Sequence, residues 1–151
     1  MGFERFLGKF GKASSLEFMP KLVEKTMLID DSEIDLFIHR RFLELCNFSK
    51  ELITYKSAEG ALDWLRNLAG DSPPNIIFLD LNMPVIDGFS FLNLFTHLPD
   101  KIKEQSRIVV LTSSNSASDR EQVFLFQNVI QMITKPIKQS DIEALRTLVT
   151  N

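Results

Sequence analysis

Short apolar segments alternate with amphipathic ones along the chain from Lys25 onward. The short segments are rich in branched and aromatic side chains, which favours β-strands. Five strands are predicted: Lys25–Asp30, Glu51–Tyr55, Asn75–Asp80, Arg107–Thr112 and Ile130–Ile133. The first, third and fourth are nearly unbroken apolar runs, as in strands buried on both faces. Strands that alternate with helical patterns predict βαβ units and therefore an α/β fold with a parallel sheet.

Two of the intervening segments carry apolar residues at helical spacing, and we expect both stripes to face the core. The first stripe comprises Ile34, Phe37, Ile38, Phe42 and Leu45, and the second comprises Ala58, Ala61, Leu62, Leu65 and Leu68. Gly70 is placed to end the second helix. Trp64 is interpreted as packing for that helix, and Cys46 as a small buried hydrophobe. His39 and His97 are expected on the surface, since neither has a second ligand at metal-binding spacing.

Serines mark three predicted helix starts. Ser32, Ser118 and Ser140 are each followed three residues later by an acid, the spacing of a capping box. These acids are Asp35, Glu121 and Glu143. Pro73-Pro74 and the polar stretch from Pro99 to Ser106 are predicted to be loops.

Composition narrows the class of protein. The chain has 151 residues, the size of one domain, and its net charge of -3 gives no broad positive field for nucleic acid or an anionic membrane surface. Its single cysteine, Cys46, cannot form an internal disulfide, which fits a reducing compartment and predicts a cytoplasmic location. No apolar run approaches the length of a membrane span.

Residues 1–24 form a predicted extension ahead of a domain at residues 25–151. Phe3, Phe6, Leu7 and Phe10 share one helical face, with basic residues off it. This pattern fits an amphipathic helix that docks on a membrane surface or partner. Two alternatives are a short helix packed on the domain itself and a leader ahead of a start at Met19.

The reactive side chains cluster at predicted strand ends. Strand one ends in Asp30-Asp31, strand three in Asp80 and strand four in Thr112, and strand five runs into Lys135. Parallel strands joined by right-handed crossovers bring their carboxyl ends to one edge of the sheet, where open α/β folds bind ligands. We therefore expect these five residues to lie together.

Carboxylates brought close together repel one another, so at neutral pH they favour a shared cation. Oxygen ligands without histidine or cysteine suit Mg²⁺, which also binds phosphate oxygens. Lys135 adds a cation that can pair with a carboxylate or a phosphoryl oxygen, and the Thr112 hydroxyl can hydrogen-bond the same group. The cluster thus points to phosphoryl chemistry with Asp80 as nucleophile.

Four separated motifs closely resemble the receiver domains of two-component response regulators: Met27–Asp31, Ile76–Gly88, Val109–Ser113 and Ile133–Pro136. The resemblance runs from about Lys25 to the C-terminus. It implies a flavodoxin-like, doubly wound sheet of five parallel strands in the order 2-1-3-4-5 with helices on both faces. It also implies a signalling phospho-acceptor that promotes its own phosphorylation and dephosphorylation, rather than a conventional enzyme.

The same resemblance implies a role for each matched position. Asp80 would accept a phosphoryl group from the phosphohistidine of a sensor kinase or phosphotransfer protein. Asp31 resembles the direct Mg²⁺ ligand, Asp30 a partner through water, and the Asn82 backbone carbonyl a third contact, with Asp80 completing the metal set. Thr112 and Lys135 resemble the residues that bind the phosphoryl oxygens, and Pro84 and Gly88 look structural.

One position departs from the family pattern. The family usually has Tyr or Phe three residues before the lysine, where this chain has Met132, which predicts a weaker or differently read switch. The chain ends roughly where the fifth helix should, so output is expected through contact with a downstream protein rather than nucleic acid.

The sequence also allows other interpretations. A degenerate receiver would keep the fold without accepting phosphate. An aspartate-nucleophile phosphatase needs a second acid at position 82, where this chain has Asn82, which cannot protonate a leaving group. A binder of flavin mononucleotide should present a Ser/Thr/Gly loop after strand one, and Asp30-Asp31 would repel its phosphate. In isolation, Asp30-Asp31 would be a helix-capping turn, Asp80 a loop acid and Lys135 a solvated lysine.

Overall fold

A computed structural model describes residues 23–114 and 116–150 of the chain. Its centre is one five-stranded sheet in the order β2-β1-β3-β4-β5, in which all neighbouring strands are parallel. The expected α/β architecture and strand order are therefore confirmed. The strands are β1 Val23–Ile29, β2 Ser49–Tyr55, β3 Ile76–Asp80, β4 Arg107–Thr112 and β5 Val129–Thr134.

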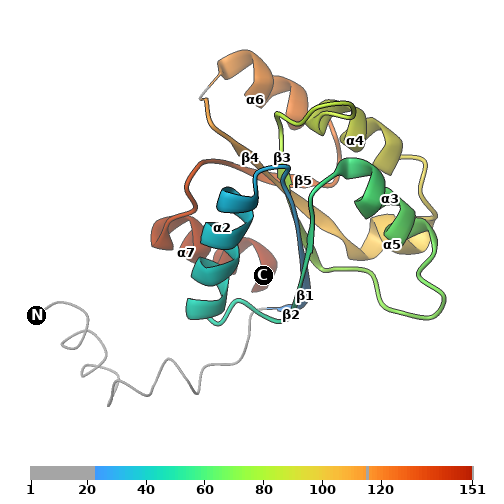
Figure 1. Cartoon of the computed structure of the whole chain (residues 1–151), viewed down its shortest axis with the longest axis horizontal. Helices are drawn as coiled ribbons and strands as arrows, with labels where there is room; N and C mark the ends of the chain where they lie inside the picture. Colours follow the sequence, from blue (N-terminus) through green and yellow to red (C-terminus); the bar gives the residue numbers. More distant parts are fainter. Residues whose placement is uncertain (1–22, 115, 151) are drawn as a thin grey trace, which may run out of the picture.

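Helices cover both faces of the sheet (Figure 1). The helices in the described part of the chain are α2 Glu33–Leu45, α3 Ala58–Arg66, α4 Gly88–Phe95, α5 Asp100–Gln105, α6 Ala117–Val123 and α7 Gln139–Thr150. One apolar core lies between the sheet and α3 to α6, and a second lies between the sheet and α2 and α7. Alternate residues of β3 point into the two cores, so the strand that ends at Asp80 is buried along its whole length.

Helix α2 corrects two predictions. The stripe expected in the core is largely exposed: Ile34 is 71% exposed, Phe37 67% and Leu45 72%. Another face of the helix packs on the sheet, and it carries three buried residues, Leu36, His39 and Leu43. Apolar residues surround most of this helix, so periodicity alone could not identify the buried face. Consequently His39 is buried rather than on the surface, whereas His97 is exposed as predicted.

The residues at which the helices begin agree only in part with the predicted capping serines. Ser32 caps α2 as predicted and accepts a hydrogen bond from the Asp35 backbone N–H. The predicted starts at Ser118 and Ser140 are wrong by one or two residues, because Ser116 caps α6 and α7 begins at Gln139. Helix α3 ends at Arg66, ahead of Gly70.

The prediction of a loop from Pro99 to Ser106 is wrong, because this segment contains the helix α5. This short helix is polar except for Ile102, the side chain that anchors it to the core. The second predicted stripe is correct, because four of its residues are buried and Leu68 packs against them. Trp64 also packs against this core, whereas Cys46 is only half-buried at the edge of the other.

Within residues 23–114 and 116–150, no helix is both long and apolar enough to cross a membrane. The amphipathic segment predicted at Phe3 to Phe10 lies outside the described residues.

Candidate functional site

Three carboxylates meet where β1 and β3 end. The two strands are neighbours in the sheet, with Ile29 opposite Leu79, so Asp30 and Asp80 follow at the same edge. One carboxylate oxygen from each of Asp30, Asp31 and Asp80 lies within 4.8 Å of the others. Asp30 and Asp80 are 2% and 3% exposed, whereas Asp31 faces solvent. The predicted acidic cluster therefore forms, with one side open.

Lys135 reaches this cluster from the end of β5. Its backbone N–H donates to the Thr112 carbonyl oxygen at 2.8 Å, which ties the lysine to the adjacent end of β4. The Lys135–Pro136 peptide bond is cis. The Lys135 Nζ atom lies 2.8 Å from Asp30 Oδ2 and 3.2 Å from Asp80 Oδ1, so the predicted lysine does pair with the acids.

A fourth acid also contacts the lysine. Asp35, in the first turn of α2, places its Oδ2 atom 2.9 Å from Lys135 Nζ. The sequence predicts Asp35 only as the acid of a capping box. The reciprocal bond of that box is not made, because the Asp35 carboxylate contacts Lys135 and the Ser32 N–H donates instead to Asp30 Oδ1 at 2.9 Å. The sequence position of Asp35 could have indicated this contact. The helix that follows Asp30-Asp31 begins at the carboxyl ends of the strands, so an acid in its first turn lies close to the cluster.

Burial and charge together set the protonation of the site. Burial raises the pKa of Asp80 to about 6; the Asp30 charge adds to the rise and Lys135 opposes it. Burial alone would lower the pKa of the Lys135 ammonium, but its hydrogen bonds to Asp30 and Asp35 and the charges of Asp30 and Asp80 outweigh this and raise it. Lys135 is therefore cationic, and in the absence of another cation Asp80 is half-ionised near pH 6 rather than near 3.8.

Thr112 and Asn82 lie close to Asp80 in the sheet and in the chain: Thr112 follows Leu111, the β4 residue opposite Asp80, and Asn82 comes two residues after Asp80. Thr112 is fully buried at the end of β4, and its hydroxyl donates to the Ser114 carbonyl oxygen at 2.9 Å and accepts from the Ser114 N–H. The hydroxyl is thus engaged with the loop that follows β4. Asn82 is exposed, and its backbone N–H donates to Asp80 Oδ1 at 3.3 Å.

The loop from β3 to α4 is fixed by a close approach at Gly88. A Cβ atom at this position would lie 2.7 Å from Leu81 Cα, and the Gly88 N–H donates to the Leu81 carbonyl oxygen at 2.8 Å. Asp87 then caps α4 by accepting from the Ser90 N–H. Glycine at position 88 is therefore required by packing next to the acidic cluster.

Two further residues bear on the site. Met132, at the position where the family usually has Tyr or Phe, is buried in the core between the sheet and α3 to α6. His39 lies on the buried face of α2; burial lowers its pKa, the Lys135 charge lowers it further, and Asp35 and Asp30 oppose the shift. Its Nε2 atom has no hydrogen-bond partner among the described residues.

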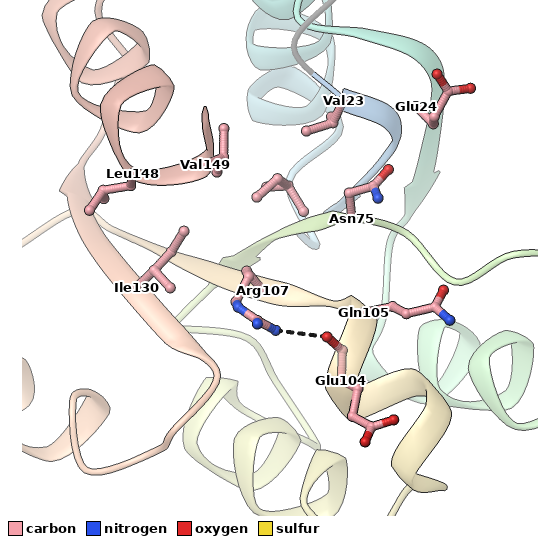
Figure 2. Close-up of a pocket in the computed structure, with 10 residues that line it drawn as sticks. Val23, Glu24, Asn75, Glu104, Gln105, Arg107, Ile130, Leu148 and Val149 are labelled. Atoms are coloured by element: carbon pink, nitrogen blue, oxygen red, sulfur yellow. Dashed lines mark hydrogen bonds between the residues drawn. The ribbon is translucent and has the colours of Figure 1, made fainter. Parts of the chain in front are cut away.

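A separate hollow lies at the opposite edge of the sheet. This pocket has a volume of about 500 Å³. Figure 2 shows its lining, in which Val23 and Asn75 lie near Arg107, Leu148 and Val149. The Arg107 guanidinium donates to the Glu104 carbonyl oxygen at 3.2 Å. The pocket is formed at the amino ends of the strands, so it shares no residue with the acidic cluster.

The cluster fits a hard divalent cation. Its donors are carboxylate oxygens from three residues, one of them open to solvent, and it contains no histidine or cysteine. Mg²⁺ prefers a few carboxylates and retains several waters, for which the exposed side at Asp31 leaves access.

The motifs and this geometry agree with known proteins. The family model of the response regulator receiver domain matches residues 26–146, so the chain belongs to the response regulator receiver family. It is a receiver domain of two-component signalling, a class of signalling phospho-acceptors that bind Mg²⁺ at an acidic pocket and interact with histidine kinases or phosphotransfer proteins.

Relatives occur in proteins of different lengths. The chain is 32% identical to response regulator Rcp1 of Synechocystis sp. over 66% of this chain and 67% of that protein. It is 26% identical to hybrid signal transduction histidine kinase L of Dictyostelium discoideum over 83% of this chain, but it spans only 7% of that kinase. A crystal structure of a response regulator receiver protein from Dyadobacter fermentans is 31% identical, with a TM-score of 0.75 over 84% of this chain and 95% of that one.

Proposed function

We propose that this domain accepts a phosphoryl group on Asp80 from the phosphohistidine of a sensor kinase or phosphotransfer protein. The observation that carries the proposal is the joint placement of Asp80, Asp30, Asp31 and Lys135: a buried carboxylate, two acids for a cation, and an ammonium 3.2 Å from Asp80 Oδ1. Position 82 holds Asn, where an aspartate-nucleophile phosphatase needs a second acid, and this favours transfer to Asp80 over turnover of a phosphomonoester.

The transfer uses the two oxygens of Asp80 differently. Oδ1 faces Lys135 and the Asn82 N–H, so we assign Oδ2 as the nucleophile. Its electron pair forms the new O–P bond while the N–P bond to the donor histidine breaks, and the imidazole leaves with that bonding pair. Lys135 and the Thr112 hydroxyl then bind phosphoryl oxygens, for which Thr112 must release Ser114.

The carboxylates of Asp30, Asp31 and Asp80 would hold Mg²⁺ together with the Asn82 backbone carbonyl, with Asp31 in direct contact and Asp30 through water. A cation held by these residues would supply charge neutralisation for the transferring phosphoryl group and would favour the ionised form of Asp80, against the effect of burial on its pKa. The same site is proposed to promote loss of the phosphoryl group to water.

The exposed apolar residues of α2 suggest where the phosphodonor docks. Ile34, Phe37 and Ile38 lie on the solvent side of the helix that carries Asp35 to the cluster. An exposed apolar group next to a polar pocket is typical of a protein interface.

We further propose that the domain comprises residues 25–151, that it acts in the cytoplasm, and that its output is contact with a downstream protein.

Intact-mass analysis tests the proposal. The protein is incubated with Mg²⁺ and a small acyl phosphate, and the mass is measured for wild type, Asp80→Asn and the matched control Asp71→Asn, an exposed loop acid. We expect one alkali-labile phosphoryl adduct on wild type and Asp71→Asn and none on Asp80→Asn. An adduct that persists in Asp80→Asn, or none on any of the three, would refute the function.

A further inference from the structure

We propose that Asp35 is a positioning residue: it holds Lys135 in place while the other acids of the site serve the metal and the phosphoryl group. This inference rests on the proposed function, and it adds a role on α2 to the residues at the strand ends.

The contact is short and joins distant parts of the chain. Asp35 Oδ2 lies 2.9 Å from Lys135 Nζ, across 100 residues of sequence, and the lysine side chain is 15% exposed. The Asp35 backbone is fixed in turn, because its N–H donates to Ser32 Oγ at the start of α2. The carboxylate is therefore delivered by a rigid helical turn and not by a mobile loop.

Asp35 differs from the other two partners of Lys135. Asp30 and Asp80 belong to the cluster that would bind the cation, and Asp80 would also carry the phosphoryl group as an acyl phosphate. Asp35 is not part of that cluster. When a cation draws charge from Asp30 and Asp80, Asp35 is the contact that keeps the ammonium next to Asp80.

The position of the ammonium matters because a charge-assisted hydrogen bond depends on direction as well as distance. Lys135 has three N–H donors, and one that stays on Asp35 restricts rotation of the other two toward Asp80. Removing Asp35 would leave a long flexible side chain free to turn toward solvent through the open side of the site.

The first test measures Lys135 without phosphoryl chemistry. The full-length protein reacts with an amine-acetylating reagent in EDTA or in saturating Mg²⁺, and acetylation of Lys135 is followed by peptide mass analysis. The variants are Asp35→Asn and the matched control Glu33→Gln, an exposed acid in the same helical turn that pairs with Lys56. In saturating Mg²⁺ we expect Lys135 of Asp35→Asn to be labelled about ten times faster than Lys135 of wild type or Glu33→Gln. This factor is the effect of one lost charge-assisted hydrogen bond. Equal rates in all three proteins would overturn the proposal.

The second test separates positioning from general charge by a double-mutant cycle. Rates of phosphorylation by a small acyl phosphate are compared for wild type, Asp35→Asn, Lys135→Met and the double variant. We expect Asp35→Asn to slow phosphorylation about tenfold when Lys135 is present and to have no effect in the Lys135→Met background. An equal loss in both backgrounds would mean that Asp35 does not act through Lys135.

The two tests keep this inference separate from the proposed function. If wild type accepts no phosphoryl group while labelling shows the effect of Asp35, the proposed function is refuted but the positioning role of Asp35 is supported. If wild type is phosphorylated while Asp35→Asn matches it in both tests, the positioning role is refuted but the proposed function is supported.

Discussion

Replacing Asp80 by asparagine should stabilise the metal-free protein at neutral pH. Asp80 is 3% exposed and lies close to the Asp30 charge, so its ionised form is disfavoured in the folded state. The unfolded chain ionises the same carboxyl freely. An amide of the same size removes this difference while it keeps the shape of the site.

The magnitude follows from the pKa of Asp80. Its value of about 6 in the folded protein lies roughly two units above the ordinary 3.8. Each unit corresponds to 1.36 kcal/mol, so the ionised Asp80 destabilises the folded state by about 3 kcal/mol at pH 7.5. This is a large part of the roughly 5–15 kcal/mol that stabilises a typical domain.

The sign of the pH dependence is specific. Because the folded state holds the Asp80 proton more tightly than the unfolded chain, this group lowers stability as pH rises from about 3.8 to 6 and adds no further change above that range. Near pH 4 the proton is bound in the folded protein, so the difference between wild type and Asp80→Asn should shrink below about 1 kcal/mol.

The assay is urea unfolding at pH 7.5 and pH 4 in EDTA, with Asp71→Asn as a control that should stay within about 0.5 kcal/mol of wild type. Asp80→Asn should be more stable by about 3 kcal/mol at pH 7.5. Mg²⁺ should narrow the gap by binding folded wild type. A variant no more stable than wild type at pH 7.5, or one whose advantage is unchanged at pH 4, would refute the reasoning.

Three further predictions concern His39, Gly88 and Phe37. Burial and the Lys135 charge lower the pKa of His39, and Asp35 and Asp30 only partly oppose this, so below pH 6.5 the unfolded chain binds a proton on His39 that the folded protein does not, and stability falls. His39→Leu should therefore lose less stability between pH 6.5 and 5 than wild type in urea unfolding, and an equal loss in both proteins would contradict this. Gly88→Ala should cost about 1–3 kcal/mol in urea unfolding because its Cβ would overlap Leu81, whereas Gly60→Ala, whose Cβ would meet only side chains, should cost less; equal costs would exclude the overlap as the cause. Phe37→Asp should slow phosphotransfer from a cognate donor protein at least about tenfold yet leave phosphorylation by a small acyl phosphate unchanged, and equal transfer rates would remove the α2 face from the docking site.

The strands and the acidic cluster were predictable because both depend on short-range patterns and on one topological rule. The run that ends at Asp80 is apolar throughout, as a strand between two helical layers must be. Parallel connections then brought Asp30, Asp80, Thr112 and Lys135 to one sheet edge without any knowledge of distances.

The errors lie where the pattern allowed two answers. Helix α2 offers apolar residues on several sides, and the sheet selected the face with Leu36, His39 and Leu43. The short helix α5 has one buried anchor, Ile102, too few to show a period. The position of Asp35 soon after Asp30-Asp31 indicated that it lies near the cluster. Its contact with Lys135, 100 residues away, depends on the direction of the Asp35 side chain, which the sequence pattern does not specify.

The central claim is that the phosphoryl group is attached to Asp80, and chemical trapping tests it most directly. Borohydride reduces an aspartyl phosphate to homoserine, so the protein is treated with acyl phosphate and Mg²⁺, reduced, digested and sequenced by mass spectrometry. We predict homoserine at position 80 and at no other acid. Homoserine at position 30, 31 or 35, or at no position, would contradict the account.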